Sequence, residues 1–132
     1  MSNYLIIGTS SGIGKKLAEQ LVDSGQKVYA TYFKNKPETN VGLPDYHYLN
    51  VLDENIPLDF LPDTLDGLVY CPGSINLRPF ERIKPGDFVT DFNLQVTGAI
   101  KIIQAAFLLS EKSSWISGQI FHVDGGMSSL KV

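Results

Sequence analysis

The chain has 132 residues and one cysteine; 43% of its residues are hydrophobic, 19% are charged, and the formal net charge is −3. This composition predicts a single soluble globular domain and excludes a disordered chain, and the negative charge argues against nucleic acid as a partner, because clustered Lys and Arg bind phosphate backbones. With no apolar run of membrane-spanning length, no signal-peptide pattern and no second cysteine for an internal disulfide, we expect a cytoplasmic protein without a membrane partner.

The N-terminal part of the chain alternates strand and helix patterns. Asn3–Ile7 is apolar and rich in strand formers, and residues 12–24 repeat apolar side chains at helical spacing. The helical pattern stops before Gly25, a residue suited to the position just past a helix end. Lys27–Tyr32 forms the next predicted strand, and residues 33–43 are polar and predict a loop.

The second half continues with short strands and one long helical pattern. Strands are predicted at residues 46–51, 67–71 and 119–123. Residues 56–66 contain two prolines, which allow a short helical turn at most. Apolar residues recur at three- and four-residue steps from Lys84 to about Ser110, which predicts a helix.

Apolar strands that are separated by helical crossovers indicate an α/β fold with a parallel sheet. We expect a Rossmann-like sheet of about five strands in the order 3-2-1-4-5, a truncated doubly wound architecture. The length predicts that residues 1–132 form one domain.

A glycine-rich stretch joins the first strand to the first helix. Free N–H groups and the helix dipole favour a phosphate at such a position. Gly8 permits the tight turn, Gly12 has no side chain to block a pyrophosphate, and Gly14 lets the helix lie close to the strand. Ser10 and Ser11 can donate hydrogen bonds to phosphate or cap the helix. The stretch predicts a dinucleotide site that comprises Gly8, Ser10, Ser11, Gly12, Ile13 and Gly14.

The spacing Gly-x-x-x-Gly-x-Gly, with Ser-Ser-Gly-Ile-Gly inside it, resembles the short-chain dehydrogenase/reductase family, although Ile7 stands where the family usually has Thr. The resemblance implies an NAD or NADP cofactor. It also implies that Asn50, usually Asp in the family, touches the adenine, with Val51 beside it. Tyr70-Cys71-Pro72-Gly73 lies where the family has Asn-Asn-Ala-Gly, so Gly73 alone is retained.

Cofactor selectivity is set after the second strand, where an acid binds the ribose of NAD and a base accepts the 2′-phosphate of NADP. Residues 31–36 contain no acid, and Lys34 or Lys36 could meet a phosphate. We therefore predict NADP over NAD, with a solvated basic loop as the alternative interpretation. A chain that binds neither nucleotide is a further alternative.

The resemblance also identifies an absence. The family's chemistry needs a Ser and a Tyr-x-x-x-Lys pair after the helix that carries its Asn, matched here by Asn93. No Tyr follows Tyr70, and we interpret the sole Tyr-x-x-x-Lys match, Tyr32 with Lys36, as coincidence. Residues 1–105 resemble the family's N-terminal half and residues 106–132 its last helix and strand, which implies an internal deletion near residues 104–107. No catalytic residue is predicted.

Three functional hypotheses follow. The chain is a nucleotide-binding remnant without oxidoreductase activity, an active oxidoreductase that uses Tyr70 or Cys71 as the acid, or a homodimerising module. The dimer would form through strand 119–123 and the helix before it, because that strand leaves an apolar sheet edge. His47 and His122 lack partners at ligand spacing, so no metal site is predicted.

Overall fold

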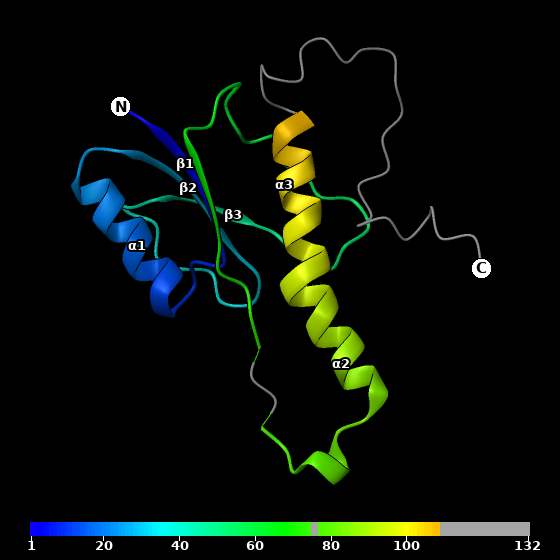
Figure 1. Ribbon diagram of the computed structural model, residues 1–132. Helices are drawn as coiled ribbons and strands as arrows, with labels where there is room; N and C mark the ends of the chain where they lie inside the picture. Colours follow the sequence, from blue (N-terminus) through cyan, green and yellow to red (C-terminus); the bar gives the residue numbers. More distant parts are fainter. Residues whose placement is uncertain (75–76, 109–132) are drawn as a thin grey trace.

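The computed structural model describes residues 1–74 and 77–108, which form a sheet with helices on both faces (Figure 1). The strands are β1 (Asn3–Ile7), β2 (Lys27–Tyr32), β3 (Asp45–Tyr48) and β4 (Gly67–Tyr70). Every pairing between them is parallel, and their order is β3-β2-β1-β4. The predicted α/β class and the first four positions of the predicted strand order are confirmed. The fifth predicted strand, residues 119–123, lies outside the described residues.

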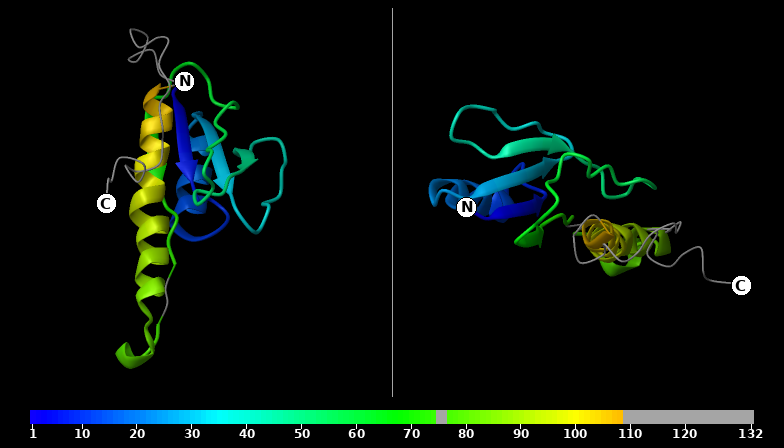
Figure 2. Two further views of the ribbon diagram at one scale, coloured as in Figure 1. Left: turned by 90° about the vertical axis from the view of Figure 1, so that its right-hand side faces the viewer. Right: turned by 90° about the horizontal axis from the view of Figure 1, so that it is seen from above.

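Two helical layers cover the sheet. Helix α1 (Gly12–Asp23) lies on one face, and α3 (Gly98–Leu108) lies on the other (Figure 1). Helix α2 (Pro85–Phe92), a π-helical turn η2 (Asn93–Thr97) and α3 follow one another as one rod, which extends beyond the sheet toward the short 3₁₀ turn η1 (Phe80–Arg82) (Figure 2). The sequence predicted a helix here but neither the π-helical turn nor η1.

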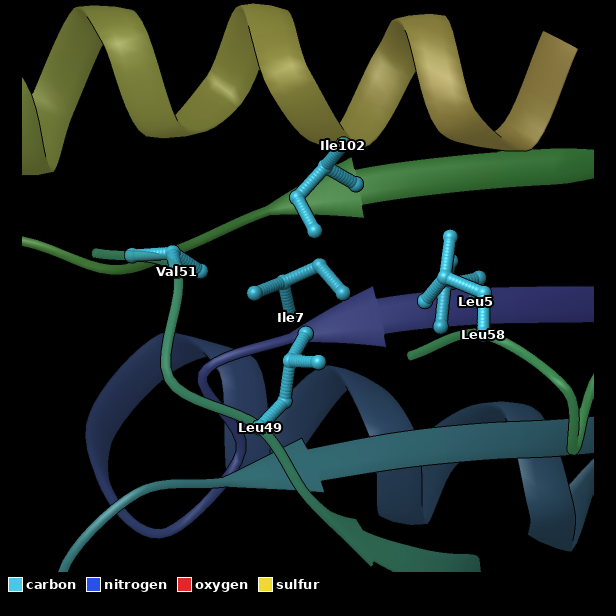
Figure 3. Close-up of a cluster of buried hydrophobic side chains, with 6 residues drawn as sticks. All are labelled: Leu5, Ile7, Leu49, Val51, Leu58 and Ile102. Carbon is cyan, nitrogen blue, oxygen red and sulfur yellow. The ribbon is translucent and has the colours of Figure 1, made fainter. Parts of the chain in front are cut away.

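The larger core lies between the sheet and α3 (Figure 3). Leu5 and Ile7 of β1 meet Ile102 of α3, and all three side chains are at most 1% exposed. The loops after β3 complete the cluster with Leu49, Val51 and Leu58. These large side chains anchor α3 to the sheet.

The core beneath α1 is built from smaller side chains. Successive residues of a strand point to opposite faces, so Ile6 leaves the α3 side and packs toward α1. Its buried neighbours are Ala18 of α1 and Val28 and Ala30 of β2. Small residues at these positions allow α1 to approach the strands closely.

Two predicted strands end earlier than their sequence patterns suggest. β3 stops at Tyr48 because the chain turns at Asn50, whose carbonyl accepts the Asp53 N–H at 3.1 Å. β4 stops at Tyr70: the Cys71 N–H still bonds to the Ile7 carbonyl at 2.9 Å, but the partner strand β1 ends there, because Gly8 has a φ of +83° and leaves the extended conformation. Both ends lie on the side of the sheet where the glycine-rich turn begins.

Candidate functional site

A groove of about 860 Å³ opens at the carboxyl ends of the four strands. Ligands of open α/β sheets bind at this edge, at the point where the strand order reverses, which here lies between β1 and β4. Ten of the residues that the sequence predicted to bind a cofactor line this groove: Gly8, Ser10, Ser11, Gly12, Ile13, Gly14, Lys34, Asn50, Val51 and Gly73. The structure therefore brings four separate segments to one place.

The turn from β1 to α1 depends on two crowded glycines. Gly8 has a φ of +83°, in the left-handed region, and a Cβ there would stand 3.0 Å from the Pro72 nitrogen. A Cβ on Gly14 would stand 2.2 Å from the Gly8 carbonyl oxygen. The first turn of α1 thus lies directly against the end of β1, as the glycine spacing predicts.

Gly12 has a different setting. Its φ is +62°, and nothing lies within 4 Å of the position that a Cβ would take. Because Gly12 also lines the groove, its backbone is open to a ligand. This open stretch of backbone is the feature that a pyrophosphate requires for close approach.

Two buried threonines fix the glycine-rich turn to the end of β2. The N–H and the Oγ1 of Thr9 both donate to the Thr31 carbonyl, at 2.8 and 2.9 Å. The Thr31 Oγ1 accepts the Gly8 N–H at 3.2 Å. The sequence analysis did not predict this pair. The sequence feature that could have indicated it is a threonine in the turn together with a second threonine near the end of an apolar strand.

The N-terminus of α1 faces the groove with its polar groups uncommitted. Ser11 occupies the N-cap position, yet its side chain makes no capping hydrogen bond, so the capping alternative is wrong for this residue. The first turn of α1 carries no acidic side chain. The orphan N–H groups of this turn and the positive end of the helix dipole therefore favour an anion.

The segment after β2 supplies the positive charge of the groove. Lys34 lines the groove and is exposed, with its Nζ 5.9 Å from the centre of the Phe33 ring. Lys36, the other candidate for a phosphate contact, does not line the groove. Tyr32, its partner in the Tyr-x-x-x-Lys match, packs edge-on against the ring of Tyr48.

The segment after β3 forms a turn at the groove. The Asn50 side chain accepts the Leu52 N–H at 3.1 Å and donates to an Asp53 carboxylate oxygen at 2.7 Å. Val51 is buried in the core below. Both donor and acceptor of the Asn50 amide are thus engaged in shaping the turn.

The end of β4 forms the opposite wall and contains the two alternative acids, Tyr70 and Cys71. The Tyr70 hydroxyl donates to the Leu94 carbonyl of the π-helical turn, and burial raises the Tyr70 pKa to about 12. Burial also raises the pKa of the Cys71 thiol. Both groups therefore hold their protons firmly at neutral pH.

Asn93 is exposed and does not line this groove. It lies instead on a second cavity of about 380 Å³, together with Thr97, Lys101 and Glu54. Its side-chain oxygen lies 3.4 Å from the Thr97 hydroxyl, which donates to it.

His47 lies on β3 and stacks on Phe60, with ring centres 3.9 Å apart. Within residues 1–74 and 77–108, no three His, Cys, Asp or Glu side chains gather as metal ligands. Over the same residues, no helix combines the length and the apolar character that crossing a bilayer requires. His122 lies outside the described residues.

No protein-family model matches this chain, and no curated protein matches it. Its structure, however, is similar to solved structures. A Burkholderia multivorans protein assigned as a short-chain alcohol dehydrogenase superposes with a TM-score of 0.70 at 15% identity, over 85% of this chain and 58% of that protein.

Two further structures show the same likeness. A short-chain dehydrogenase family protein from Francisella tularensis has a TM-score of 0.69 at 20% identity, over 83% of this chain and 47% of that one. Serine dehydrogenase from Escherichia coli has a TM-score of 0.65 at 20% identity, over 81% of this chain and 55% of that one. This chain therefore shares the Rossmann-like fold of these proteins and spans roughly half of their length.

Proposed function

We propose that this chain binds a nicotinamide dinucleotide, with NADP preferred over NAD, in the groove around the Gly8–Gly14 turn. One observation supports the proposal: ten residues predicted from sequence for this role, from four separate segments, line one groove at a helix N-terminus. The volume of about 860 Å³ falls within the range of small-molecule and cofactor sites.

Each part of the groove has a role that fits its chemistry. The open backbone at Gly12 and the hydroxyls of Ser10 and Ser11 bind the pyrophosphate at the positive end of α1. Lys34, at the end of the groove beside β2, binds the 2′-phosphate of NADP through its ammonium group. No acidic residue lies in residues 31–36 to favour the free ribose of NAD.

A bound nicotinamide dinucleotide supplies a hydride donor or acceptor, but we infer that this chain does not use it for carbonyl reduction. A proton donor must accompany the hydride. The Tyr70 hydroxyl already donates its hydrogen bond to the Leu94 carbonyl. Burial also raises the pKa of Tyr70 and of Cys71, so both groups are weaker acids than usual. With no Tyr-x-x-x-Lys pair after residue 70, the chain is best explained as a binding remnant of a longer dehydrogenase, shortened by an internal deletion.

The test is a fluorescence titration of the full chain with NADPH and NADH. We expect both to bind, NADPH more tightly. Lys34→Ala should weaken NADPH roughly tenfold, the equivalent of one charged hydrogen bond, and leave NADH unchanged. Lys36→Ala is the matched control, because Lys36 lies in the same loop but does not line the groove. Absence of binding by either nucleotide would overturn the proposal, and turnover of a carbonyl panel that is lost in Tyr70→Phe or Cys71→Ala would establish the active alternative.

A second candidate function is self-association, and the rod of α2, η2 and α3 favours it. One face of this rod carries large apolar side chains that are 39–59% exposed: Phe88, Val89, Phe92, Val96, Ile100 and Ile103. Between residues 92 and 108 the sequence has one charge, Lys101, which is buried. A helix that is apolar on both faces is normally covered on both.

We propose that a second copy of this chain covers this face. The six side chains leave roughly 500 Å² of apolar surface open, counting an aromatic side chain at about 200 Å². An apolar patch of this size is comparable to the largest patch on a typical monomer, which is often an interaction site, and it is more than half of the ~800 Å² that each partner buries in a stable complex. An uncharged face is also self-complementary across a twofold axis. The strand 119–123, predicted to join this interface, lies outside the described residues.

Sedimentation of the full chain at tens of micromolar, roughly the range in which such interfaces persist, tests this second proposal. We expect a dimer that becomes a monomer in Phe92→Lys/Ile103→Lys. Gln20→Lys, on the exposed face of α1, is the matched control and should remain dimeric. A monomeric wild-type chain would show that another segment or partner covers the face.

A further inference from the structure

Lys101 is a charged residue in an unusual setting. It lies on α3 with 7% of its surface exposed, among residues that face the sheet. Its Nζ donates to the main-chain carbonyl of Asp53, 48 residues away in the sequence. Among the described residues, no ion pair includes Lys101.

The acceptor belongs to the turn that forms the β3 side of the groove. Val51 and Leu52 of this turn line the groove on one side and the second cavity on the other. The turn is therefore a thin wall between two open spaces. Two hydrogen bonds lie within the turn. The Leu52 N–H donates to the Asn50 side chain, and the Asp53 N–H donates to the Asn50 carbonyl. They fix the shape of the turn but do not connect it to the rest of the fold.

Lys101 supplies a polar link between this wall and α3. Burial of an ammonium group costs solvation free energy, and an apolar residue of similar size at such a position is often neutral or stabilising. Stability alone thus gives little reason for a lysine here. The position of the turn does explain the lysine, because its ammonium group donates a hydrogen bond to the Asp53 carbonyl and an apolar side chain could not.

We propose that Lys101 is a positioning residue that holds the Asn50–Asp53 turn against the adenosine end of the bound dinucleotide. This inference rests on the proposed dinucleotide site. The adenosine ribose lies at the end of β2 in this class of fold, and β3 is the next strand outward. The turn after β3 is therefore on the adenosine side of the groove, away from the nicotinamide.

The test compares Lys101→Met with the wild-type full chain. Met keeps the length of the side chain but has no donor, so the thermal midpoint should be unchanged or higher. Affinity for ADP-ribose, which contains the adenosine half, should fall roughly tenfold, the equivalent of one lost hydrogen bond, whereas affinity for nicotinamide mononucleotide should stay the same. Without ligand, the NMR order parameters of Leu52 and Asp53 should fall below those of β3.

Ile102→Val is the matched control, because it trims the next residue on the same helix, within the core that also contains Val51, but leaves the Lys101 donor in place. It should leave the order parameters and the ADP-ribose to mononucleotide ratio unchanged. Unaltered order parameters in Lys101→Met, or equal losses for both ligands, would overturn the role of Lys101. Failure of the wild-type chain to bind either ligand would overturn the dinucleotide site instead, and the order parameters would still report whether Lys101 holds the turn.

Discussion

Helix α1 and the rod that ends in α3 cover opposite faces of one sheet, but they are attached in different ways. α1 contacts the sheet through its own small residues, Gly14 and Ala18, which are buried next to β1 and β2. α3 lies on a cluster of large side chains centred on Ile102. The rod also has two polar links to the rest of the fold, from Tyr70 to the Leu94 carbonyl of η2 and from Lys101 of α3 to the Asp53 carbonyl.

Their outer faces differ as well. The outer face of α1 carries Lys15, Lys16, Gln20 and Asp23, as expected for a helix exposed to water. The outer face of the rod is apolar, from Phe88 to Ile103. α1 therefore has the polar outer face of an ordinary surface helix, and its N-terminal turn lies directly against the end of β1. The rod, in contrast, exposes large apolar side chains on the face that we propose a second copy covers.

The largest expected effect separates the two cores. Ile102→Ala removes a fully buried side chain from the α3 cluster and should lower the free energy of unfolding by about 4 kcal/mol. Leu17→Ala, at a half-buried position of α1, should cost about 2 kcal/mol, because less apolar surface is lost. Urea unfolding of the two variants measures both values. Equal losses would show that the two layers are attached with similar strength.

The next prediction addresses the close approach of α1. Gly14→Ala should destabilise the fold by about 3 kcal/mol, because the added Cβ stands 2.2 Å from a main-chain oxygen that cannot rotate away. Gly86→Ala is the matched control on α2, where a Cβ meets nothing within 4 Å. That change should stabilise the protein by about 0.5 kcal/mol, since alanine loses less backbone entropy in a helix. If the unfolding midpoint shifted in the same direction in both variants, relative to the wild type, this interpretation would be contradicted.

The two layers also differ in how far the sequence predicted them. The bounds of β1 and β2 match the prediction, and α1 ends within one residue of it, because strand alternation, helical spacing and Gly25 are local signals. The glycine spacing located the groove for the same reason. The residues predicted for the site come from four segments and line one groove because each segment follows a strand, and parallel strands end at one edge.

Features that depend on distant contacts were missed. The π-helical turn at Asn93–Thr97 lies where the Tyr70 hydroxyl meets the Leu94 carbonyl, and nothing in the helical pattern shows that contact. The early end of β3 depends on hydrogen bonds of the Asn50 turn, which Lys101 holds from another element. The link between Thr9 and Thr31 also joins separate segments. A single sequence gives the residue types for such contacts but not their pairing.

The smallest expected effect tests the polar attachment of the rod. Tyr70→Phe removes the hydroxyl that donates to Leu94 and should cost about 1 kcal/mol near pH 8. Burial raises the Tyr70 pKa from 10.0 to about 12, so the folded protein holds the phenol proton more tightly than the unfolded chain does. The stabilisation is therefore complete below about pH 10 and is lost as the pH rises through about 12. Urea unfolding from pH 8 to 11 should show the difference between wild type and Tyr70→Phe shrinking as the pH increases. Tyr48→Phe, at an exposed tyrosine of β3, controls for the general effect of alkaline pH, and a pH-independent difference for Tyr70→Phe would show that the hydroxyl does not help to attach the rod.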